Sequence, residues 1–534
     1  MQSSKQQEAV EMVFYGHDAC EQQELKEFKV DATIPSKYRG TAADQRDMVV
    51  LGKKQVLRRN FKFGTMLGFA STVMASWEVL LPLFGLVLVD GGTPDLFWGF
   101  IVEACGMLLV YASLAELASM SPTAGGQYHW VSEYGPPKLE KLLRYLVGWL
   151  CAIGWQVYLA GVCFMVRGII QGLIALNYPT YVPERWHATL LTIAIIASSI
   201  FFNTFLAVRL PLIEGIVLVL HLCGIFAIIV PLWVLAPRAP AHTALLEFQN
   251  KGGWPTTGLS AMIGLVTPLN VLIGYDCSVH MSEEIEDASL TLPKAIIWSV
   301  APNAVLGLLM IITLAFTAGD IPSILDSPSG EPFIQIFYNV TQSHAGATVM
   351  AAIIVVLLCS CCFSEVATAS RQLWSFSRDR GFPGSDWLAV VQQGWNIPLR
   401  AVLVSFVVVS LLACINIGST TALRSISSLG GVAILSSYLV TIGCLIWRRL
   451  YGAPLPPRRW SLGKAGLGIN IAAFLFVLPL WFFTFWPLAT PVLASTMNWS
   501  SAIFFGVLLI AMVYYVIKGR YEYTGPVALV KREV

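Results

Sequence analysis

Four ionisable side chains lie within long apolar stretches. A charge there is costly, so each of them is a candidate functional residue. Glu78, Glu214, Asp276 and His280 are candidates for carrying a proton, because a buried carboxylate or imidazole can exchange one near neutral pH. Asp276, His280 and Glu284 are spaced by four and would share one face of a helix. Glu78 could instead be a neutralised buried acid. The alternative for the later acids is a solvated helix end, comprising Glu283, Glu284, Glu286 and Asp287.

Other charges in apolar stretches have simpler interpretations. Glu214 is followed seven residues later by His221, so the two would share a face, and Glu214 could be a gate residue or an interfacial acid. Glu103 and Arg167 are predicted to neutralise each other between neighbouring helices.

Two of the apolar stretches are interrupted by small or polar residues that would unwind a helix, at Ser71–Ser76 and at Gly274–Asp276. Unwound backbone within a membrane offers amide groups to a carboxylate and carbonyl groups to an ammonium ion. Aromatic rings at Trp77 and Tyr275 could close over such a solute or make cation–π contacts with it. Small-residue helix packing is the alternative reading. The predicted substrate-binding residues are Ser71, Thr72, Ala75, Ser76, Trp77, Gly274, Tyr275 and Asp276.

The elements that must position these residues are membrane-spanning helices. The 534-residue chain is 56% hydrophobic and only 12% charged, whereas a soluble protein carries roughly 25% charged residues. Twelve stretches are long enough to cross the hydrocarbon layer as helices. They are 66–89, 96–119, 145–176, 186–207, 210–236, 258–287, 295–318, 347–374, 401–417, 425–447, 465–490 and 499–517.

The distribution of positive charge predicts the orientation. If the N-terminus is cytoplasmic, nearly all Lys and Arg residues fall on the inner side, as the positive-inside rule requires. The outer connections then contain few, namely Arg185, Arg238, Lys251 and Arg424. We therefore predict a multi-pass integral membrane protein with both termini in the cytoplasm.

The two interruptions are five spans apart, as expected if spans 1–5 and 6–10 are inverted repeats. This predicts a cytoplasmic tail at 1–62, a first repeat at 63–236 and a second at 258–447. Spans 11 and 12 occupy 465–517, and a second cytoplasmic tail occupies 518–534.

Several classes of function and site are not supported by the sequence. The cysteines at 359, 361 and 362 lack nearby histidines, so we expect them to pack rather than bind metal. All cysteines except Cys20 lie in apolar stretches, which disfavours a disulfide framework. No hydrolase triad, HExxH motif, phosphate-binding glycine loop or basic block is present, so neither an enzyme, a cofactor nor a nucleic-acid partner is expected.

Three motifs carry a family resemblance, which covers roughly residues 60–520. The segment 115–130, ending Gly125-Gly126-Gln127-Tyr128-His-Trp130, resembles the loop after the second span of the amino acid–polyamine–organocation superfamily. Residues 274–284 resemble its sixth-span signature, and residues 369–379 the end of its eighth span. The combination is most similar to the fungal amino acid/choline permeases, which carry choline, γ-aminobutyrate, polyamines and biotin precursors.

The resemblance implies a leucine-transporter-like 5+5 fold with two additional helices, alternating access and usually proton-coupled uptake. We expect a permease for an amino acid or related amine that is driven by the proton gradient. A choline, polyamine or γ-aminobutyrate permease is an alternative, as is a non-transporting nutrient sensor on the same fold. Sodium is the less favoured coupling ion, for which the candidate residues are Ser364, Glu365 and Thr368.

Two tripeptides match the N-glycosylation pattern, and the predicted orientation places both outside. They begin at Asn339 and Asn498. We expect the plasma membrane as the location, with a vacuolar or other internal membrane as the alternative.

Overall fold

The structure is a computed structural model that describes residues 34–325, 327, 329–392, 394–494 and 496–526. This part of the chain is almost entirely α-helical, and twelve of its helical segments are long and apolar enough to cross a membrane. The prediction of an all-α protein with twelve spans is therefore confirmed. Cys20, the first part of the predicted N-terminal tail and the end of the predicted C-terminal tail lie outside the described residues.

The first and sixth spans are each divided into separate helices, as predicted. The first comprises α4 (Phe63–Met74) and α5 (Ser76–Val87), and the sixth comprises α12 (Thr257–Gly264), α13 (Val266–Leu272) and α14 (Cys277–His280). The remaining spans are built on α6 (Gly92–Met120), α8 (Glu140–Asn177), α9 (Arg185–Phe205), α10 (Leu210–Leu235), α15 (Ala288–Thr317), α18 (His344–Arg378), α20 (Leu399–Gly418), α21 (Thr420–Tyr451), α22 (Gly466–Phe483) and α23 (Ser500–Tyr514).

Short elements connect the spans. Two strands, β1 (Asp90–Gly91) and β2 (Gln249–Asn250), pair antiparallel. The short α-helices are α2 (Ser36–Arg39), α3 (Ala42–Val50), α7 (Gln127–Tyr134), α11 (Ala241–Leu246), α16 (Ile321–Leu325), α17 (Pro332–Thr341), α19 (Ser385–Leu388) and α24 (Arg520–Glu522). The 3-10 turns are η1 (Ala207–Arg209), η2 (Ser282–Glu284) and η3 (Gly463–Ala465), and η4 (Tyr515–Gly519) is a π-helix that extends α23.

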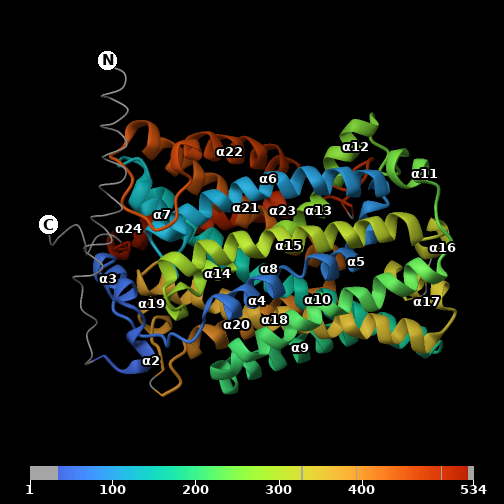
Figure 1. Cartoon of the computed structure of the whole chain (residues 1–534), viewed down its shortest axis with the longest axis horizontal. Helices are drawn as coiled ribbons and strands as arrows, with labels where there is room; N and C mark the ends of the chain where they lie inside the picture. The colour runs from blue at the N-terminus through green and yellow to red at the C-terminus, as the bar shows by residue number, and fades with distance from the viewer. Residues whose placement is uncertain (1–33, 326, 328, 393, 495, 527–534) are drawn as a thin grey trace, which may run out of the picture.

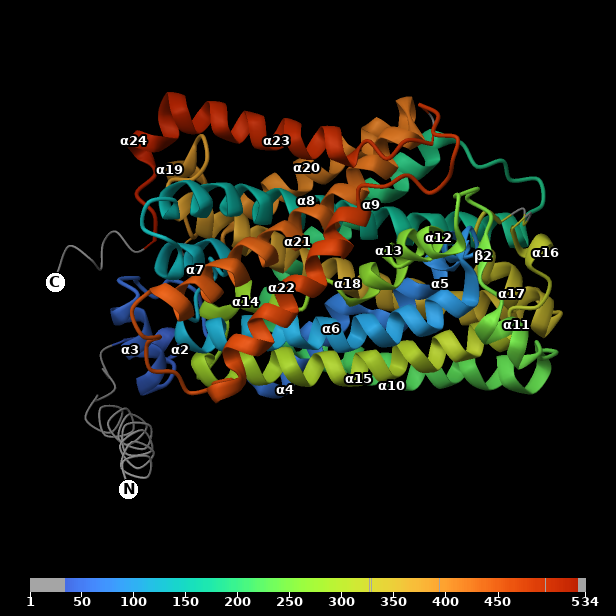
Figure 2. The same cartoon turned by 90° about the horizontal axis from the view of Figure 1, so that it is seen from above.

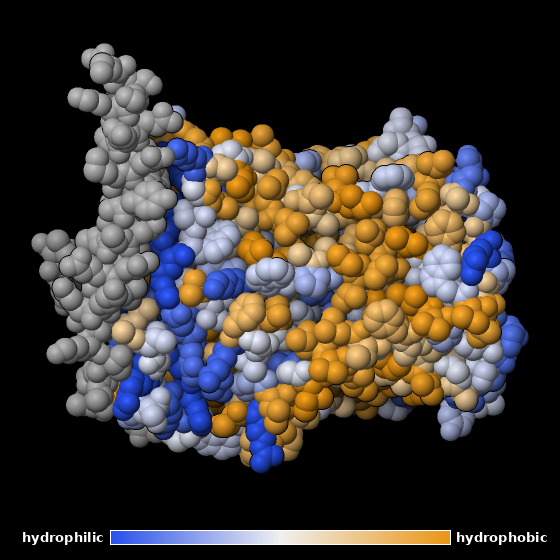
Figure 3. Space-filling view, viewed as in Figure 1, coloured by the Kyte–Doolittle hydropathy of each residue, from blue (hydrophilic) through white to orange (hydrophobic). Residues whose placement is uncertain are grey.

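The spans lie side by side along the long axis of the molecule (Figure 1). At one end, α2 and α3 from the start of the described chain lie on the same side as α24 from its end, and we call this the terminal end (Figures 1 and 2). The opposite end carries α11, α16 and α17 (Figures 1 and 2). An even number of spans requires this arrangement. Between the two ends the visible surface is largely apolar, as a surface facing lipid must be (Figure 3).

The predicted boundaries are wrong where the sixth span ends. The sequence predicted that the helix after the break continues to residue 287, but this helix stops at His280, and Asp287 has a left-handed φ of 53°. Glu284 therefore does not continue the face of Asp276 and His280. The alternative of solvated acids is also wrong for Glu283 and Glu284, because both are buried. The eleventh span likewise ends at Phe483 rather than at residue 490.

The segment before the first span explains this early ending. Phe61 forms a parallel bridge with Ile285, so the chain after α14 is held in extended form. Asp44, which is buried, accepts hydrogen bonds at 2.8 and 2.9 Å from the amides of Asp287 and Ala288 and so caps the start of α15. Arg59 Nη1 lies 3.2 Å from the Asp44 carboxylate. The described part of the predicted tail is thus docked across the terminal end.

Arg167 does not pair with Glu103, which corrects the predicted neutralisation. Arg167 Nη1 donates to Gln171 Oε1 at 3.0 Å, whereas neither carboxylate oxygen of Glu103 has a hydrogen-bond partner among the described residues. The Arg167 charge acts instead on Glu331, just before α17. Burial raises the pKa of Glu331 to about 7, although the guanidinium opposes the shift.

Glu116, near the end of α6, joins three segments of the terminal end. It is fully buried and forms ion pairs with Arg449 at the end of α21 and with Arg458 in the following connection. The Leu462 amide donates to the same carboxylate at 3.1 Å. A buried carboxylate is stable only with such compensation, and its removal leaves two arginines without their counter-charge.

We predict that Glu116→Gln lowers the free energy of unfolding by about 3 kcal/mol, because it leaves partly buried guanidinium groups uncompensated. The matched control is Glu522→Gln, which breaks an exposed 3.3 Å pair with Lys518 and should cost ~0.5 kcal/mol. Thermal unfolding of both variants in detergent, followed by tryptophan fluorescence, measures the difference. Equal Tm values for the two variants would contradict the role given to Glu116.

Candidate functional site

The interruption of the first span is confined to one residue. Ala75 adopts the left-handed conformation, with φ 38° and ψ 48°, between α4 and α5. This conformation costs a non-glycine residue roughly 1–2 kcal/mol, so surrounding contacts must hold it. The Ser76 hydroxyl makes such contacts with Asn303. It lies 3.0 Å from the Asn303 side-chain oxygen Oδ1 and 2.9 Å from the Asn303 main-chain carbonyl oxygen. Ser71 and Thr72 remain helical, so the break is shorter than the predicted one, which extended from Ser71 to Ser76.

The interruption of the sixth span is longer and depends on one glycine. The chain leaves α13 after Leu272 and re-enters helix at Cys277, and Gly274 between them has a φ of 108°, which residues with a side chain rarely adopt. The Gly274 amide donates to the Tyr111 hydroxyl at 3.1 Å, and that hydroxyl donates to the Leu272 carbonyl at 2.8 Å. One side chain from α6 therefore satisfies two backbone groups that the break sets free.

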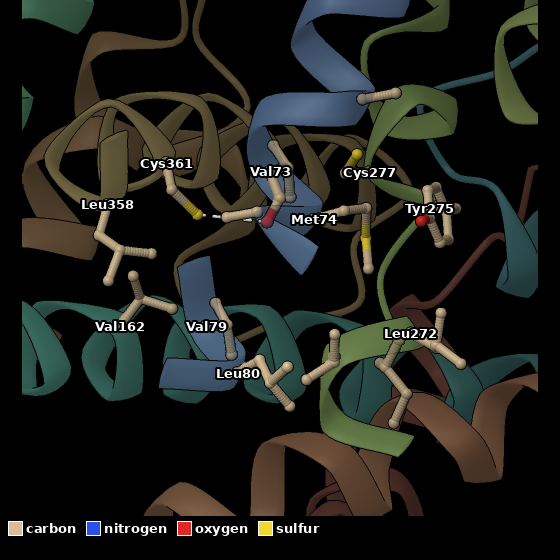
Figure 4. Close-up of a cluster of buried hydrophobic side chains, with 14 of the residues drawn as sticks. Val73, Met74, Val79, Leu80, Val162, Leu272, Tyr275, Cys277, Leu358 and Cys361 are labelled. Carbon is tan, nitrogen blue, oxygen red and sulfur yellow. Dashed lines mark hydrogen bonds between the residues drawn. The ribbon is translucent and has the colours of Figure 1, made fainter. Parts of the chain in front are cut away.

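The two interruptions face each other near the middle of the molecule. In Figure 4 the end of α4, at Val73 and Met74, lies beside Tyr275 and Cys277 of the sixth span. The Cys361 thiol of α18 donates to the Val73 carbonyl at 3.2 Å (Figure 4). This cysteine, predicted only to pack, also supplies a partner to the backbone next to the first break.

Asp276 is the carboxylate at the second break, and it is buried. It accepts hydrogen bonds from Gln127 Nε2 at 2.5 Å and from the Tyr438 hydroxyl. His280 Nε2 lies 3.6 Å from the carboxylate, beyond hydrogen-bonding distance, while His280 Nδ1 lies 3.0 Å from the Ala124 carbonyl. Because a carbonyl only accepts, Nδ1 carries a proton, and Nε2 can take up another one facing Asp276.

Aromatic rings surround this carboxylate. The Tyr111 ring lies 4.8 Å from that of Tyr275 and 6.0 Å from that of Tyr438, and the Trp155 ring lies 5.8 Å from the His280 imidazole. All of these side chains are buried. The combination of one carboxylate and several rings, next to free helix ends, can bind a cation that carries apolar groups.

A second titratable pair joins α5 to α10. Glu78 Oε1 lies 2.6 Å from His221 Nδ1, and both side chains are at most 2% exposed. Glu78 Oε2 and His221 Nε2 have no hydrogen-bond partner in the described chain. The Trp77 ring lies 6.0 Å from the imidazole. Trp77 and Glu78 therefore face α10, and Trp77 does not close over the same space as Tyr275.

Glu214 forms a third buried group, between α10, α4 and α18. The Ser364 hydroxyl donates to Glu214 Oε1 at 2.5 Å. Thr72 lies beside it, with its hydroxyl donating to the Gly68 carbonyl at 2.8 Å. Thr72, predicted as a substrate-binding residue, is thus adjacent to a predicted proton-coupling residue. The predicted site residues form three neighbouring groups rather than one pocket.

Ion pairs cross the terminal end beneath these groups. Arg371 Nε donates to Glu284 at 2.7 Å, and Arg378 makes a two-pronged contact with Glu283 at 2.8 and 2.9 Å. Burial would raise the pKa of Glu283, but the Arg378 guanidinium outweighs it and lowers the pKa to about 2. These bonds tie the end of α18 to the chain that follows the sixth span.

At the opposite end a pocket of about 270 Å³ reaches between the outer parts of the first and sixth spans. Its lining includes Leu86 at the end of α5, Asn270 on α13 and Asn498 before α23. Asn498 Nδ2 donates to the Thr484 and Trp486 carbonyls at 2.9 and 3.2 Å. Asn339, the other predicted acceptor of a glycan, lies half-buried on α17.

Sequence reasoning missed the partners of the predicted residues. Gln127, Tyr111, Tyr438 and His221 contact them from other parts of the chain. For Tyr111, Tyr438 and His221 the available signal was a hydrogen-bonding side chain within an otherwise apolar span, whereas Gln127 lies on α7, between two spans.

Comparisons with known proteins agree with this architecture. The model of a family described as amino acid permease matches residues 61–510. A protein of Macrophomina phaseolina described as an amino acid/polyamine transporter is 31% identical over 82% of this chain and 97% of its own length. A choline transporter of Saccharomyces cerevisiae is 28% identical over 90% of this chain and 85% of its own length. An amino-acid permease of Arabidopsis thaliana is 26% identical over 90% and 95%, respectively.

We predict that Tyr111→Phe destabilises the break in the sixth span, since it removes the partner of one buried amide and one buried carbonyl, at a cost of roughly 1–3 kcal/mol. Hydrogen exchange of the peptide that contains Gly274 should become faster, and Tm should fall. The control is Tyr158→Phe, whose hydroxyl donates only to the Asn270 carbonyl at 3.1 Å. Unchanged exchange at Gly274 in Tyr111→Phe would refute this role.

Proposed function

We propose that this chain, which belongs to the amino acid permease family, is a secondary active transporter of a small solute with a positively charged amine. The solute is an amino acid or a related amine such as choline or a polyamine. The protein moves it by alternating access and couples the movement to protons.

The observation that carries this proposal is the position of Asp276. It lies at the second break, which faces the first, within a set of tyrosine and tryptophan rings. An ammonium group gains from the carboxylate, from the ring faces and from the carbonyl groups of the broken helices. The first amides of α5 have no partner within the helix and form a positive helix end, which suits the carboxylate of an amino acid.

The names of the relatives support recognition of an ammonium group rather than of one particular solute. One is described as a carrier of amino acids or polyamines and another as a carrier of choline. Amino acids, polyamines and choline share a positively charged nitrogen. A site built on Asp276 and the surrounding rings would recognise that shared part, and the space beyond it would select the remainder.

The two ends of the molecule support alternating access. The terminal end is crossed by ion pairs and by the docked segment before α4, whereas a pocket enters from the opposite end as far as Asn270, four residues before Gly274. We assign this arrangement to a state closed toward the cytoplasm in the plasma membrane, with the termini cytoplasmic as the positive-inside rule requires. Inward opening would then break the pairs of Arg371 and Arg378.

Buried titratable groups support proton coupling. The Glu78–His221 pair bridges two helices, and each partner keeps one free polar atom in the described chain. A proton on this pair removes the cost of a buried negative charge, so its gain or loss would change how firmly α5 is held against α10. Asp276 with His280, and Glu214 with Ser364, are further places where a proton would change an interhelical contact.

We predict that Asp276→Asn reduces uptake of the transported amine by about tenfold or more, because one charge-assisted interaction contributes roughly 1.5–3 kcal/mol. The measurement is uptake into proteoliposomes of radiolabelled amino acids, γ-aminobutyrate, choline and putrescine. Asp386→Asn, at an exposed carboxylate on α19, is the control. Wild-type uptake by Asp276→Asn, or no uptake of any of these amines by the wild-type protein, would refute the proposal.

We predict that Glu78→Gln abolishes accumulation but keeps exchange of solute across the membrane, since glutamine can still bond His221 but cannot release a proton. Wild-type uptake should increase as the pH outside is lowered and should fall with a proton ionophore, and the variant should show neither response. The same pH dependence in both proteins would exclude Glu78 from coupling. A wild-type protein that is insensitive to the ionophore would exclude proton coupling altogether.

A further inference from the structure

A cavity of about 550 Å³ lies at the terminal end, apart from the broken helices. Four segments line it: the chain before α4, the end of α18, the connection after α19 and the chain after α24. Its volume is in the range of pockets that bind small molecules. None of the residues assigned above to the solute or to coupling protons lines it.

The charged residues in the lining are predominantly basic. Lys53 and Lys54 come from the first segment and Arg378 from α18, while Asp379 is the one acid among the described lining residues. Asp379 already accepts a hydrogen bond from the Tyr128 hydroxyl at 2.7 Å. The amide side chains of Gln392 and Asn396 add further polar groups to the lining.

The positive charge of Lys53 is only weakly compensated. Its ammonium group donates to Thr123 Oγ1 at 2.9 Å, and no carboxylate lies within ion-pair distance in the described chain. Burial and the neighbouring Arg378 guanidinium lower the pKa of Lys53 to about 8, although the carboxylates of Asp379, Glu283 and Glu133 oppose the shift. A bound anion would reverse this destabilisation of the ammonium form.

Arg378 keeps N–H groups that have no partner in the described chain. Its two terminal nitrogens bind Glu283, and its guanidinium lies 4.4 Å from the centroid of the Trp374 ring. Its Nε has no hydrogen-bond partner among the described residues. A guanidinium edge and two ammonium groups around one cavity match the several acceptor oxygens of a phosphate group better than a single carboxylate.

We propose that this cavity binds a phosphate-bearing anion, supplied by a lipid headgroup or by a soluble phosphate ester, and that the bound anion holds the terminal end closed. Gln55, next to the two lysines, donates to the Glu283 carbonyl at 2.7 Å, so the segment that lines the cavity also secures the chain after the sixth span. The cavity has this lining only while that segment is docked. A ligand bound there favours the docked state, because it binds that state more tightly.

The test uses the full-length protein in detergent with two probes, inositol trisphosphate and dioctanoyl phosphatidic acid, which separate the soluble source from the lipid source. We expect at least one probe to raise Tm in a concentration-dependent manner. Lys53→Gln combined with Lys54→Gln should weaken its binding tenfold or more. Lys54→Glu alone should weaken binding several-fold. Because it changes only an exposed side chain, it tests the site even if the double variant misfolds. Lys141→Gln, exposed at the same end, should change binding less than twofold.

Binding that is equal in all variants, or absent with both probes, would overturn the site. The closing effect rests on the proposed transport function and needs its own measurement. The bound probe, supplied on the side of the termini, should lower initial uptake several-fold in wild-type proteoliposomes but not in the double variant. Undiminished uptake would overturn the closing effect alone. The binding measurement needs no transport, so its result stands even if the proposed function fails.

Discussion

A backbone amide or carbonyl in the hydrocarbon layer must have a hydrogen-bond partner within the protein, because no water is there to supply one. A regular helix meets this demand by itself, whereas a broken helix does not. In this protein Tyr111 satisfies both sides of the sixth-span break, and Cys361 bonds the carbonyl next to the first. Breaks can therefore exist only where other spans enclose them. The span of α4 and α5 is one of the two most buried of the described spans, and the last two spans are the least buried.

Three of the charged groups inside the molecule follow the same logic, since each is bonded across a helix boundary. Glu78 reaches from α5 to α10, Glu214 to α18, and Asp276 to α7 and α21. Such contacts stabilise one relative position of the helices and are lost when the helices separate. Binding of a proton or an ammonium group at such a contact can therefore change which relative position of the helices is favoured.

The sequence was sufficient for the architecture and for the places of the breaks. Apolar length predicts spans regardless of their partners, and small or hydroxyl residues in mid-span predicted where α4 and α13 end. The end of the sixth span was missed because a contact 224 residues away in the chain, Phe61 with Ile285, holds the chain extended. His221 and Tyr438 were missed as partners for a similar reason. Which side chain meets Glu78 or Asp276 depends on how distant spans rotate about their axes, and hydropathy does not encode that rotation.

The cap that Asp44 places on α15 has a consequence for biosynthesis. Its partners, the amides of Asp287 and Ala288, are 243 and 244 residues further along the chain. At the usual rate of translation, about 5–20 residues per second, Asp44 leaves the ribosome roughly 10–50 s before they do. During this interval the first six spans are synthesised and must be held in the bilayer without this contact. Emergence of the start of α15 is thus the earliest moment at which the nascent chain can form this cap.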